Sequence, residues 1–388
     1  MTTATSTCTI PSPFLSEAIL QIKNPVMDPL TLFSSVTLHG LASTNNGARS
    51  IHLTRTQSFP AKRFAYDLKG PGLEGSGKDW KAISPLVGQL HADIEITEQL
   101  SEGRIGLVFA ARLVSLRRSL HDEPLPISSI PYPSEFCVKL AKPEYIRSLA
   151  REAWFYEQLS KTEGYPGAVT PICFGFFTCP LPSESGVQLP ALSSARIKPE
   201  PPSHTPAEEE PIYDRYYDDL DMEYLDYFDD GRTSHRNSPW NLKQWRERTD
   251  RSPVIGILMT ERIGKHIRPD DFPMSPTFRI PKGDNYFSKE ALTEISALLD
   301  DLNAVGILQG DMRFNNILWA ASETKHWLSD SPQICPRHRQ VHLYRIIDFD
   351  RAKRYNHENS VDRSHFARMQ TSELREPQFW GDCTQRLH

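Results

Sequence analysis

Residues from about 180 to 250 limit the fold more than any other feature of the sequence. The stretch begins with closely spaced prolines and serines and then turns acidic, with eleven aspartates and glutamates but one arginine from Glu208 to Asp230. So few apolar side chains cannot offset the entropy of ordering the chain. We predict a disordered insertion here, so the folded part must be built from the two blocks on either side.

Five tyrosines are interleaved with the acidic residues of the predicted insertion: Tyr213, Tyr216, Tyr217, Tyr224 and Tyr227. Acidic segments with aromatic side chains can become ordered on a basic partner. A binding segment for a protein partner and an inert loop both remain open interpretations of this stretch.

The charge and cysteine patterns exclude several classes of function. The net charge of −5 lacks the basic surplus that nucleic-acid binding requires. The longest clean apolar run covers only residues 254–259, whereas a membrane-spanning helix needs about 20 apolar residues. We therefore predict no nucleic-acid and no membrane partner. The six cysteines lack the spacing of a disulfide framework and the chain opens without a secretory signal, so we expect reduced thiols in the cytoplasm or nucleus.

Hydrophobic periodicity predicts the local structure up to residue 261. β-Prone runs predict strands, and apolar residues spaced three and four apart predict a helix over residues 145–159. Residues 1–90 carry no chemistry that we can assign, and we treat them as an N-terminal extension of unknown role. The predicted strands cover residues 32–38, 50–54, 94–100, 106–114, 136–140, 172–177 and 254–259.

The second block opens with the clearest amphipathic helix of the chain, residues 288–305. Its aliphatic side chains recur at three and four residues, and Gly306 stands where a C-terminal cap belongs. A short apolar strand, a polar loop and a return strand at 317–319 follow. The last predicted strand, residues 343–347, runs directly into Asp348.

A lysine and a glutamate in the first block form a candidate pair. Lys139 lies in a short β-prone run, and Glu152 follows thirteen residues later in the predicted helix. Taken alone, Lys139 is typical of an edge-strand lysine that faces solvent. A lysine paired with a helix carboxylate would instead be oriented towards phosphate. Glu157 is the rival partner, and we favour Glu152 because Tyr156 could then pack towards Phe349.

A glycine pair precedes the lysine. Gly103 and Gly106 lie three residues apart, with Val108 two residues further on. Glycine allows the backbone to approach a phosphate closely and to adopt positive φ. An ordinary hairpin turn explains the pair equally well.

The second block adds three polar positions. Asp311 and Asn316 are separated by four residues in the loop after the long helix, and Asp348 and Asp350 flank Phe349. Asp311 and Asn316 could merely cap a polar turn. Carboxylate and amide oxygens are also ligands that suit magnesium, a hard cation.

In this order and spacing, the motifs resemble those of the protein-kinase-like superfamily over about residues 93–355. They are similar to its glycine-rich loop, its V-A-I-K lysine, its H-R-D-x4-N loop and its D-F-G motif. The resemblance implies a two-lobed, protein-kinase-like α+β fold. A β-sheet N-lobe with one helix would cover residues 91–263, including the insertion, and a shortened, mainly helical C-lobe would cover residues 264–388.

The resemblance also implies an ATP- and magnesium-dependent phosphotransferase. It would transfer the γ-phosphoryl group to a hydroxyl acceptor, either a protein serine or threonine or a small molecule. The implied catalytic residues are Asp311, Lys139 and Arg313, and the implied magnesium ligands are Asn316 and Asp348. The implied ATP-binding residues are Gly103, Gly106, Val108, Lys139, Glu152 and, in a hinge after the last N-lobe strand, Thr260, Glu261 and Ile263.

The chain departs from the kinase pattern at several positions. Gln309 and Gly310 replace the histidine and arginine of H-R-D, and Asp350 replaces the glycine of D-F-G. The pairing of Gly310 with Asp311 and the acidic Asp350 are similar to small-molecule and atypical kinases, including the aminoglycoside and choline kinase-like groups. Only 38 residues follow Asp350, without an A-P-E motif. A pseudokinase that acts as a nucleotide-binding or protein-interaction scaffold, and a fragment lacking its last helices, remain alternatives.

Two further motifs carry weaker signals. Residues 72–79 nearly match a Walker loop, but Asp79 stands where a serine or threonine should bind magnesium. Cys335, His338 and His342 have loose zinc-like spacing. Because arginines and a proline surround them, we favour a basic surface loop.

Overall fold

The computed structural model describes residues 28–44, 47–58, 90–103, 105–126, 133, 135–142, 145–180, 254–266, 289–320, 333–355 and 360–373. Nearly all of the predicted insertion and the Walker-like segment 72–79 lie outside these residues. The proposed division of the chain at residues 90 and 263 also stays a prediction.

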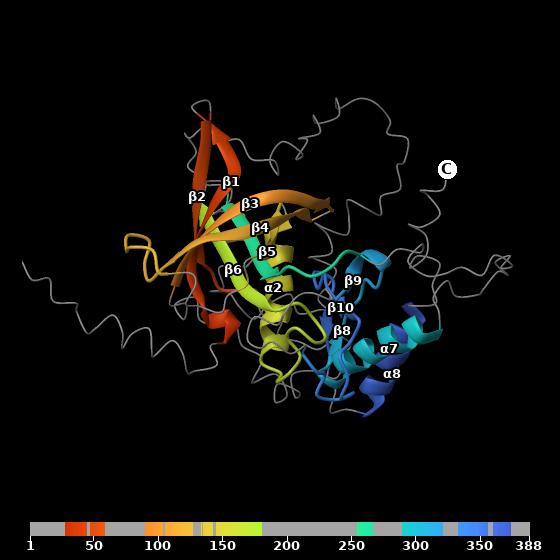
Figure 1. The fold of residues 1–388 in the computed structure, drawn as a ribbon. Coiled ribbons are helices and arrows are strands. Elements are labelled where there is room, and N and C mark those ends of the chain that lie inside the picture. Colours follow the sequence, from red (N-terminus) through yellow and green to blue (C-terminus); the bar gives the residue numbers. More distant parts are fainter. Residues whose placement is uncertain are drawn as a thin grey trace, which may run out of the picture.

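Seven strands form a closed barrel in the order β1-β2-β6-β7-β5-β4-β3 (Figure 1). Neighbouring strands are antiparallel except for β1 and β3, which are parallel. The strands are β1 (Phe33–Thr44), β2 (Gly47–Arg55), β3 (Leu90–Glu102), β4 (Gly106–Arg117), β5 (Glu135–Ala141), β6 (Cys173–Pro180) and β7 (Val254–Glu261).

This barrel contradicts the two-lobed, protein-kinase-like α+β fold, and with it the resemblance to that superfamily. The physical reason lies in the first two strands. β1 pairs with β3 from Phe33 to His39, and β2 pairs with β6 at Thr54 and Arg55. These pairings close both edges of what would otherwise be an open five-stranded sheet, and closure leaves no unpaired edge. The described residues also contain just three α-helices, too few for a mainly helical lobe.

Every second side chain along the strands points into the barrel and fills its interior. In β2 the side chains of Ile51, Leu53 and Arg55 are buried, while those of His52 and Thr54, which alternate with them, are exposed. Three phenylalanines meet inside the barrel. Phe136 contacts Phe33 and Phe174 edge-on, with ring centroids 6.1 and 5.2 Å apart. Apolar burial of this kind is the main favourable term in folding.

The helices are α2 (Ile146–Ser160), α7 (Lys289–Ala304) and α8 (Ser360–Glu373). Figure 1 shows α2 beside the barrel and α7 and α8 on the opposite side of the short strands β8 to β10. No helix in the described part of the chain is long and apolar enough to cross a membrane.

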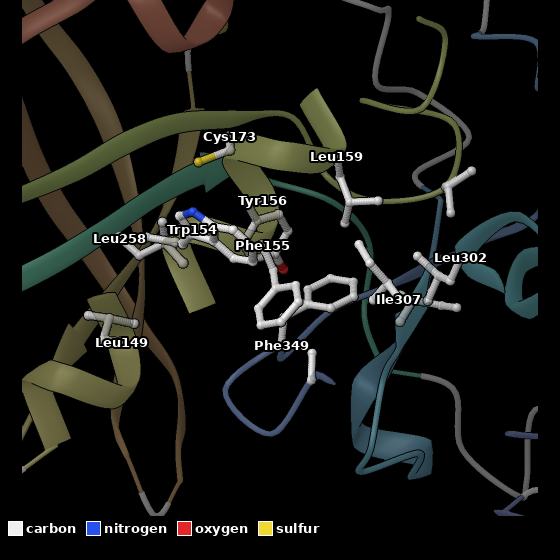
Figure 2. Close-up of a cluster of buried hydrophobic side chains, with 14 of the residues drawn as sticks. Leu149, Trp154, Phe155, Tyr156, Leu159, Cys173, Leu258, Leu302, Ile307 and Phe349 are labelled. Atoms are coloured by element: carbon white, nitrogen blue, oxygen red, sulfur yellow. The ribbon is translucent and has the colours of Figure 1, made fainter. Parts of the chain in front are cut away.

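A second hydrophobic cluster joins α2 to the C-terminal part of the chain (Figure 2). Trp154 and Phe155 of α2 are fully buried, and they belong to the same cluster as Leu302 of α7 and Phe349. Complete burial of a large apolar side chain stabilises a fold by about 1.5–3 kcal/mol. This cluster therefore fixes the segment after α7 against the barrel.

Short strand pairs complete the C-terminal part. β8 (Ile307–Leu308) pairs with β11 (Lys353–Arg354), and β9 (Ile317–Trp319) pairs with β10 (Tyr344–Ile346). The predicted helix over 288–305 is confirmed as α7, and Gly306 adopts the expected positive φ of 75°. The strands and the helix predicted in the first block are confirmed as β1 to β7 and α2.

Candidate functional site

Lys139 lies on an interior strand of the barrel. In β5 it pairs with Val108 of β4 on one side and with Leu258 of β7 on the other. Its side chain is 17% exposed. The alternative of an edge-strand lysine facing solvent is therefore wrong, and the side chain must satisfy its charge within the protein.

Two carboxylates bind the Lys139 ammonium. The Nζ atom donates to Glu152 Oε2 at 2.7 Å and to Asp348 Oδ1 at 2.6 Å. Glu152 comes from α2 and is 2% exposed, whereas Asp348 follows β10 and is 28% exposed. The rival Glu157 instead accepts a hydrogen bond from Ser58 Oγ at 2.6 Å. Glu152 and Asp348 lie 13 and 209 positions from Lys139 in the sequence, yet both contact its ammonium group.

The site carries more negative than positive charge. Burial lowers the pKa of Lys139, but the charges of Asp348, Glu152 and Asp350 outweigh it and hold the pKa above its ordinary value. Burial raises the pKa of Glu152, and the opposing charge of Lys139 does not cancel the effect. Even when Glu152 holds a proton, the charges of Asp348 and Asp350 outnumber the single ammonium and favour a further cation at this site.

Gln309 holds the two polar loops of the site together. Its Nε2 donates to the carbonyl oxygens of Asp348 at 2.9 Å and of Ile347 at 3.3 Å, while its Oε1 accepts from the Asp311 N–H at 2.7 Å. An amide can donate and accept at once, which a carboxylate or an ammonium cannot. Gln309 stands where the H-R-D motif has a histidine, and no pattern in the sequence indicates that it joins these loops.

The loop after β8 positions Asp311 and Asn316. The Nδ2 of Asn316 donates to the Asp311 carbonyl at 2.7 Å, so its amide oxygen is the atom left to meet a cation. Arg313 Nε lies 2.8 Å from Asp311 Oδ1. Gly310 is required here, because its φ is 79° and an added Cβ would lie 2.5 Å from the Arg351 carbonyl oxygen.

The ring of Phe349 anchors the segment that carries Asp348. It packs edge-on against Tyr156 of α2, with ring centroids 5.1 Å apart (Figure 2). The predicted contact between these two rings is confirmed. Asp348 itself adopts a positive φ of 66°, a conformation that is uncommon outside glycine. The packing of Phe349 therefore stabilises the unusual backbone conformation of Asp348, the partner of Lys139.

The glycine pair forms the turn of the β3–β4 hairpin. The Gly103 N–H donates to the Gly106 carbonyl at 2.8 Å, and Lys142 Nζ donates to the Gly103 carbonyl at 3.1 Å. An added Cβ at Gly106 would lie 2.0 Å from the Leu140 carbonyl oxygen, so close strand packing explains this glycine. Val108 lies two residues into β4, opposite Lys139. The nucleotide-binding role of the turn stays a prediction.

The predicted hinge residues lie at the end of β7. Thr260 is buried between its partners Cys137 of β5 and Cys173 of β6. Two hydrogen bonds join Glu261 to Ile172. The Glu261 N–H donates to the Ile172 carbonyl at 2.7 Å, and the Ile172 N–H donates to Glu261 Oε2 at 3.1 Å. Its N–H is therefore committed within the protein. Ile263 is half-buried just beyond the strand.

No protein-family model matches the chain, and no curated protein matches it. The candidate function must therefore be argued from the side chains of the site itself.

Proposed function

We propose that the chain binds ATP with magnesium at the Lys139 site and transfers the γ-phosphoryl group to a hydroxyl acceptor. The observation that carries the proposal is the position of Lys139 Nζ, 2.7 Å from Glu152 and 2.6 Å from Asp348. The proposal rests on this arrangement of side chains and on no property of the barrel.

The donor set fits a nucleotide and its metal ion. Lys139 supplies a fixed positive charge for phosphate oxygens, and Glu152 orients it from α2. The Asp348 carboxylate and the Asn316 amide oxygen are ligands that suit Mg²⁺. Bound magnesium would neutralise negative charge on the phosphates. Because Asp348 also pairs with Lys139, these two residues would adjust together when the ligand binds.

Asp311 is the group that would meet the acceptor. Its carboxylate would take the hydroxyl proton as the acceptor oxygen bonds to the γ-phosphorus and the bond to the bridging oxygen breaks, leaving ADP. Arg313, 2.8 Å away, supplies positive charge beside it. The acceptor is a protein serine or threonine or a small-molecule hydroxyl.

The same ion pair favours a second candidate function. The Arg313 guanidinium already occupies one oxygen of Asp311. If the pair persists with ATP bound, the chain would hold nucleotide without transferring phosphate and would act as a scaffold.

Under either function we place the chain in the cytoplasm or nucleus. The four described cysteines, Cys137, Cys173, Cys179 and Cys335, are all free thiols, as in a reducing compartment.

Calorimetric titration with ATP, with and without Mg²⁺, tests the proposal. We expect the wild type to bind ATP more tightly with magnesium, and Lys139→Met to bind it at least about tenfold more weakly, a loss of about 1.4 kcal/mol. Methionine keeps a similar length, so the strand should be retained.

Lys161→Met is the matched control, since Lys161 lies at the end of α2 and donates to Gln158 at 3.1 Å. Equal ATP affinity in the Lys139 variant and the wild type would contradict the proposal. Absence of ATP binding by the folded wild type would contradict it too.

A further inference from the structure

A second polar cluster lies outside the Lys139 site, between α7 and the loop before β10. It consists of Asp301 from α7 with Cys335, His338 and His342 from the loop, and their ligand atoms all lie within 4.8 Å of one another. The side chains of Asp301, Cys335 and His342 are fully buried. The predicted basic surface loop is confirmed for Arg337 and Arg339, which are exposed, but Cys335 and His342 of the same loop are buried.

The ligand atoms converge on one oxygen of Asp301. The distances to its Oδ2 are 3.2 Å from Cys335 Sγ, 3.3 Å from His338 Nδ1 and 3.4 Å from His342 Nε2. Cys335 Sγ lies 3.6 Å from His338 Nδ1. A tetrahedral zinc ion with bonds of about 2.0–2.3 Å holds its ligand atoms about 3.3–3.7 Å apart. Three of the four separations fall in this range and the Cys335–Asp301 separation lies 0.1 Å below it, while all four ligand atoms lie within 4.8 Å of one another.

His342 is oriented as a metal ligand. Its Nδ1 lies 2.9 Å from Glu294 Oε1, while its buried Nε2 makes no hydrogen bond to the described residues. Glu294 and Asp301 lie seven residues apart on α7, so they share one face two turns apart. A carboxylate on the outer nitrogen of a histidine fixes the ring and strengthens the inner nitrogen as a ligand.

The loop is shaped to bring its three ligands together. The Cys335 N–H donates to the Gln340 carbonyl at 2.8 Å, and the Arg339 N–H donates to the Cys335 carbonyl at 2.9 Å. Arg339 adopts a positive φ of 57° between the two histidines. On the far side of Asp301, Arg337 Nε lies 3.2 Å from Oδ1, which leaves Oδ2 facing the cluster.

We propose that Asp301, Cys335, His338 and His342 together bind one Zn²⁺ ion. One thiolate, two imidazoles and one carboxylate form a mixed sulfur, nitrogen and oxygen set, which suits zinc better than magnesium or calcium. Four protein ligands complete a tetrahedral shell, as in structural zinc sites. The ion would fasten the loop to α7.

The position of the loop gives this zinc ion a structural consequence. His342 stands two residues before β10, and β10 leads into Asp348. The Leu343 N–H also donates to Glu294 Oε1 at 2.7 Å. An ion that ties His342 to Asp301 would therefore hold the start of β10 against α7.

Metal analysis of the full chain, purified from zinc-supplemented cells, tests the proposal. We expect about one zinc ion per chain after dialysis. After chelation and reconstitution with Co²⁺, we expect the visible absorption of tetrahedral cobalt and a thiolate-to-cobalt band in the near ultraviolet. A protein without stoichiometric zinc, or cobalt-treated protein without these bands, would show a hydrogen-bonded network only and would overturn the proposal.

Two cysteine variants locate the site. We expect Cys335→Ser to lose the thiolate band and at least about tenfold in zinc affinity. Cys179→Ser, the same change in barrel strand β6, should keep both. If Cys335→Ser does not fold, His338→Ala serves instead, since His338 is the most exposed of the four ligands. An unchanged zinc affinity in the folded ligand variant would overturn the assignment.

Discussion

The two buried polar clusters of this protein differ in the source of their positive charge. At the first, the chain supplies the cation itself, because Lys139 lies between Glu152 and Asp348. At the second, Arg337 pairs with Asp301 Oδ1, but Oδ2 faces only a thiol and two imidazoles. The Lys139 cluster can be stable before a ligand arrives, whereas the Oδ2 side of the second cluster needs an ion or protons from solvent. We therefore expect changes at the first cluster to alter function and changes at the second to alter stability.

The largest effect is expected for Asp301→Ala. Removing this fully buried carboxylate leaves Arg337, His338 and His342 without their common partner. Loss of one partner from a buried charged cluster costs about 3–5 kcal/mol in the free energy of unfolding. Urea denaturation measures the loss.

Asp300→Ala is the matched control for that change. Asp300 is the neighbouring residue, is 64% exposed, and lies 4.0 Å from the same arginine. An exposed substitution of this kind should change stability by less than about 0.5 kcal/mol. Equal unfolding midpoints for the two variants would show that Asp301 contributes no more to stability than an exposed surface residue.

Asp311→Asn should alter turnover while leaving ATP binding nearly unchanged. The amide keeps the shape of the loop but cannot take the acceptor proton, so we expect phosphoryl transfer to fall by about 10²-fold or more. Asp122→Asn, on an exposed turn, is the control. Turnover that survives in the Asp311 variant would contradict the catalytic role. A wild type that binds ATP without turnover would instead favour the scaffold function.

A smaller effect is expected in the pH dependence of stability. Burial raises the pKa of Glu152, so the folded protein retains a proton that the unfolded chain releases. Stability from this group is fully present below the ordinary glutamate pKa of about 4.3 and is lost as the pH rises through the higher folded value. Glu152→Gln should therefore flatten the decline in the urea midpoint above about pH 4.3. Identical pH profiles for the variant and the wild type would show that Glu152 does not cause the pH dependence, and would contradict the prediction.

The smallest effect is expected from shortening the segment between β6 and β7. Pro180 and Val254 are partners in the antiparallel register, so the two strand ends already lie side by side. Replacing residues 185–248 with a short Gly/Ser linker should not lower the melting temperature, since a shorter loop costs less entropy to close. A large loss of stability would show that the replaced segment contributes to the packed structure.

The sequence predicted what depends on local periodicity. The spacing of apolar residues gave α2 and α7, and the glycine cap at Gly306 followed from its place after the last apolar turn. It did not predict the barrel, because the pairing of β1 with β3 joins residues more than fifty positions apart. Alternation identifies a strand but does not name its partner. The expected β-sheet N-lobe was therefore wrong in its topology, although its strands were predicted correctly.

The two candidate sites also differ in how far the sequence predicts them. Lys139, Glu152 and Asp348 belong to motifs whose spacing is visible in the sequence, and the structure brings them together. Asp301 has no such signal, because on α7 it is one of several acidic residues of an amphipathic helix. A search for carboxylates seven apart on a helix, next to a Cys-x2-His-x3-His segment, could have found it.

The order of the strands has a consequence for synthesis of the chain. β7 lies between β5 and β6 in the barrel, yet its residues follow β6 by more than seventy positions. Until Val254–Glu261 leaves the ribosome, β5 and β6 each present an unpaired edge to other chains. Exposed edges of this kind recruit other strands, and long-range pairing is slow to form. A nascent chain that stops before β7 should therefore be the species that most needs a chaperone.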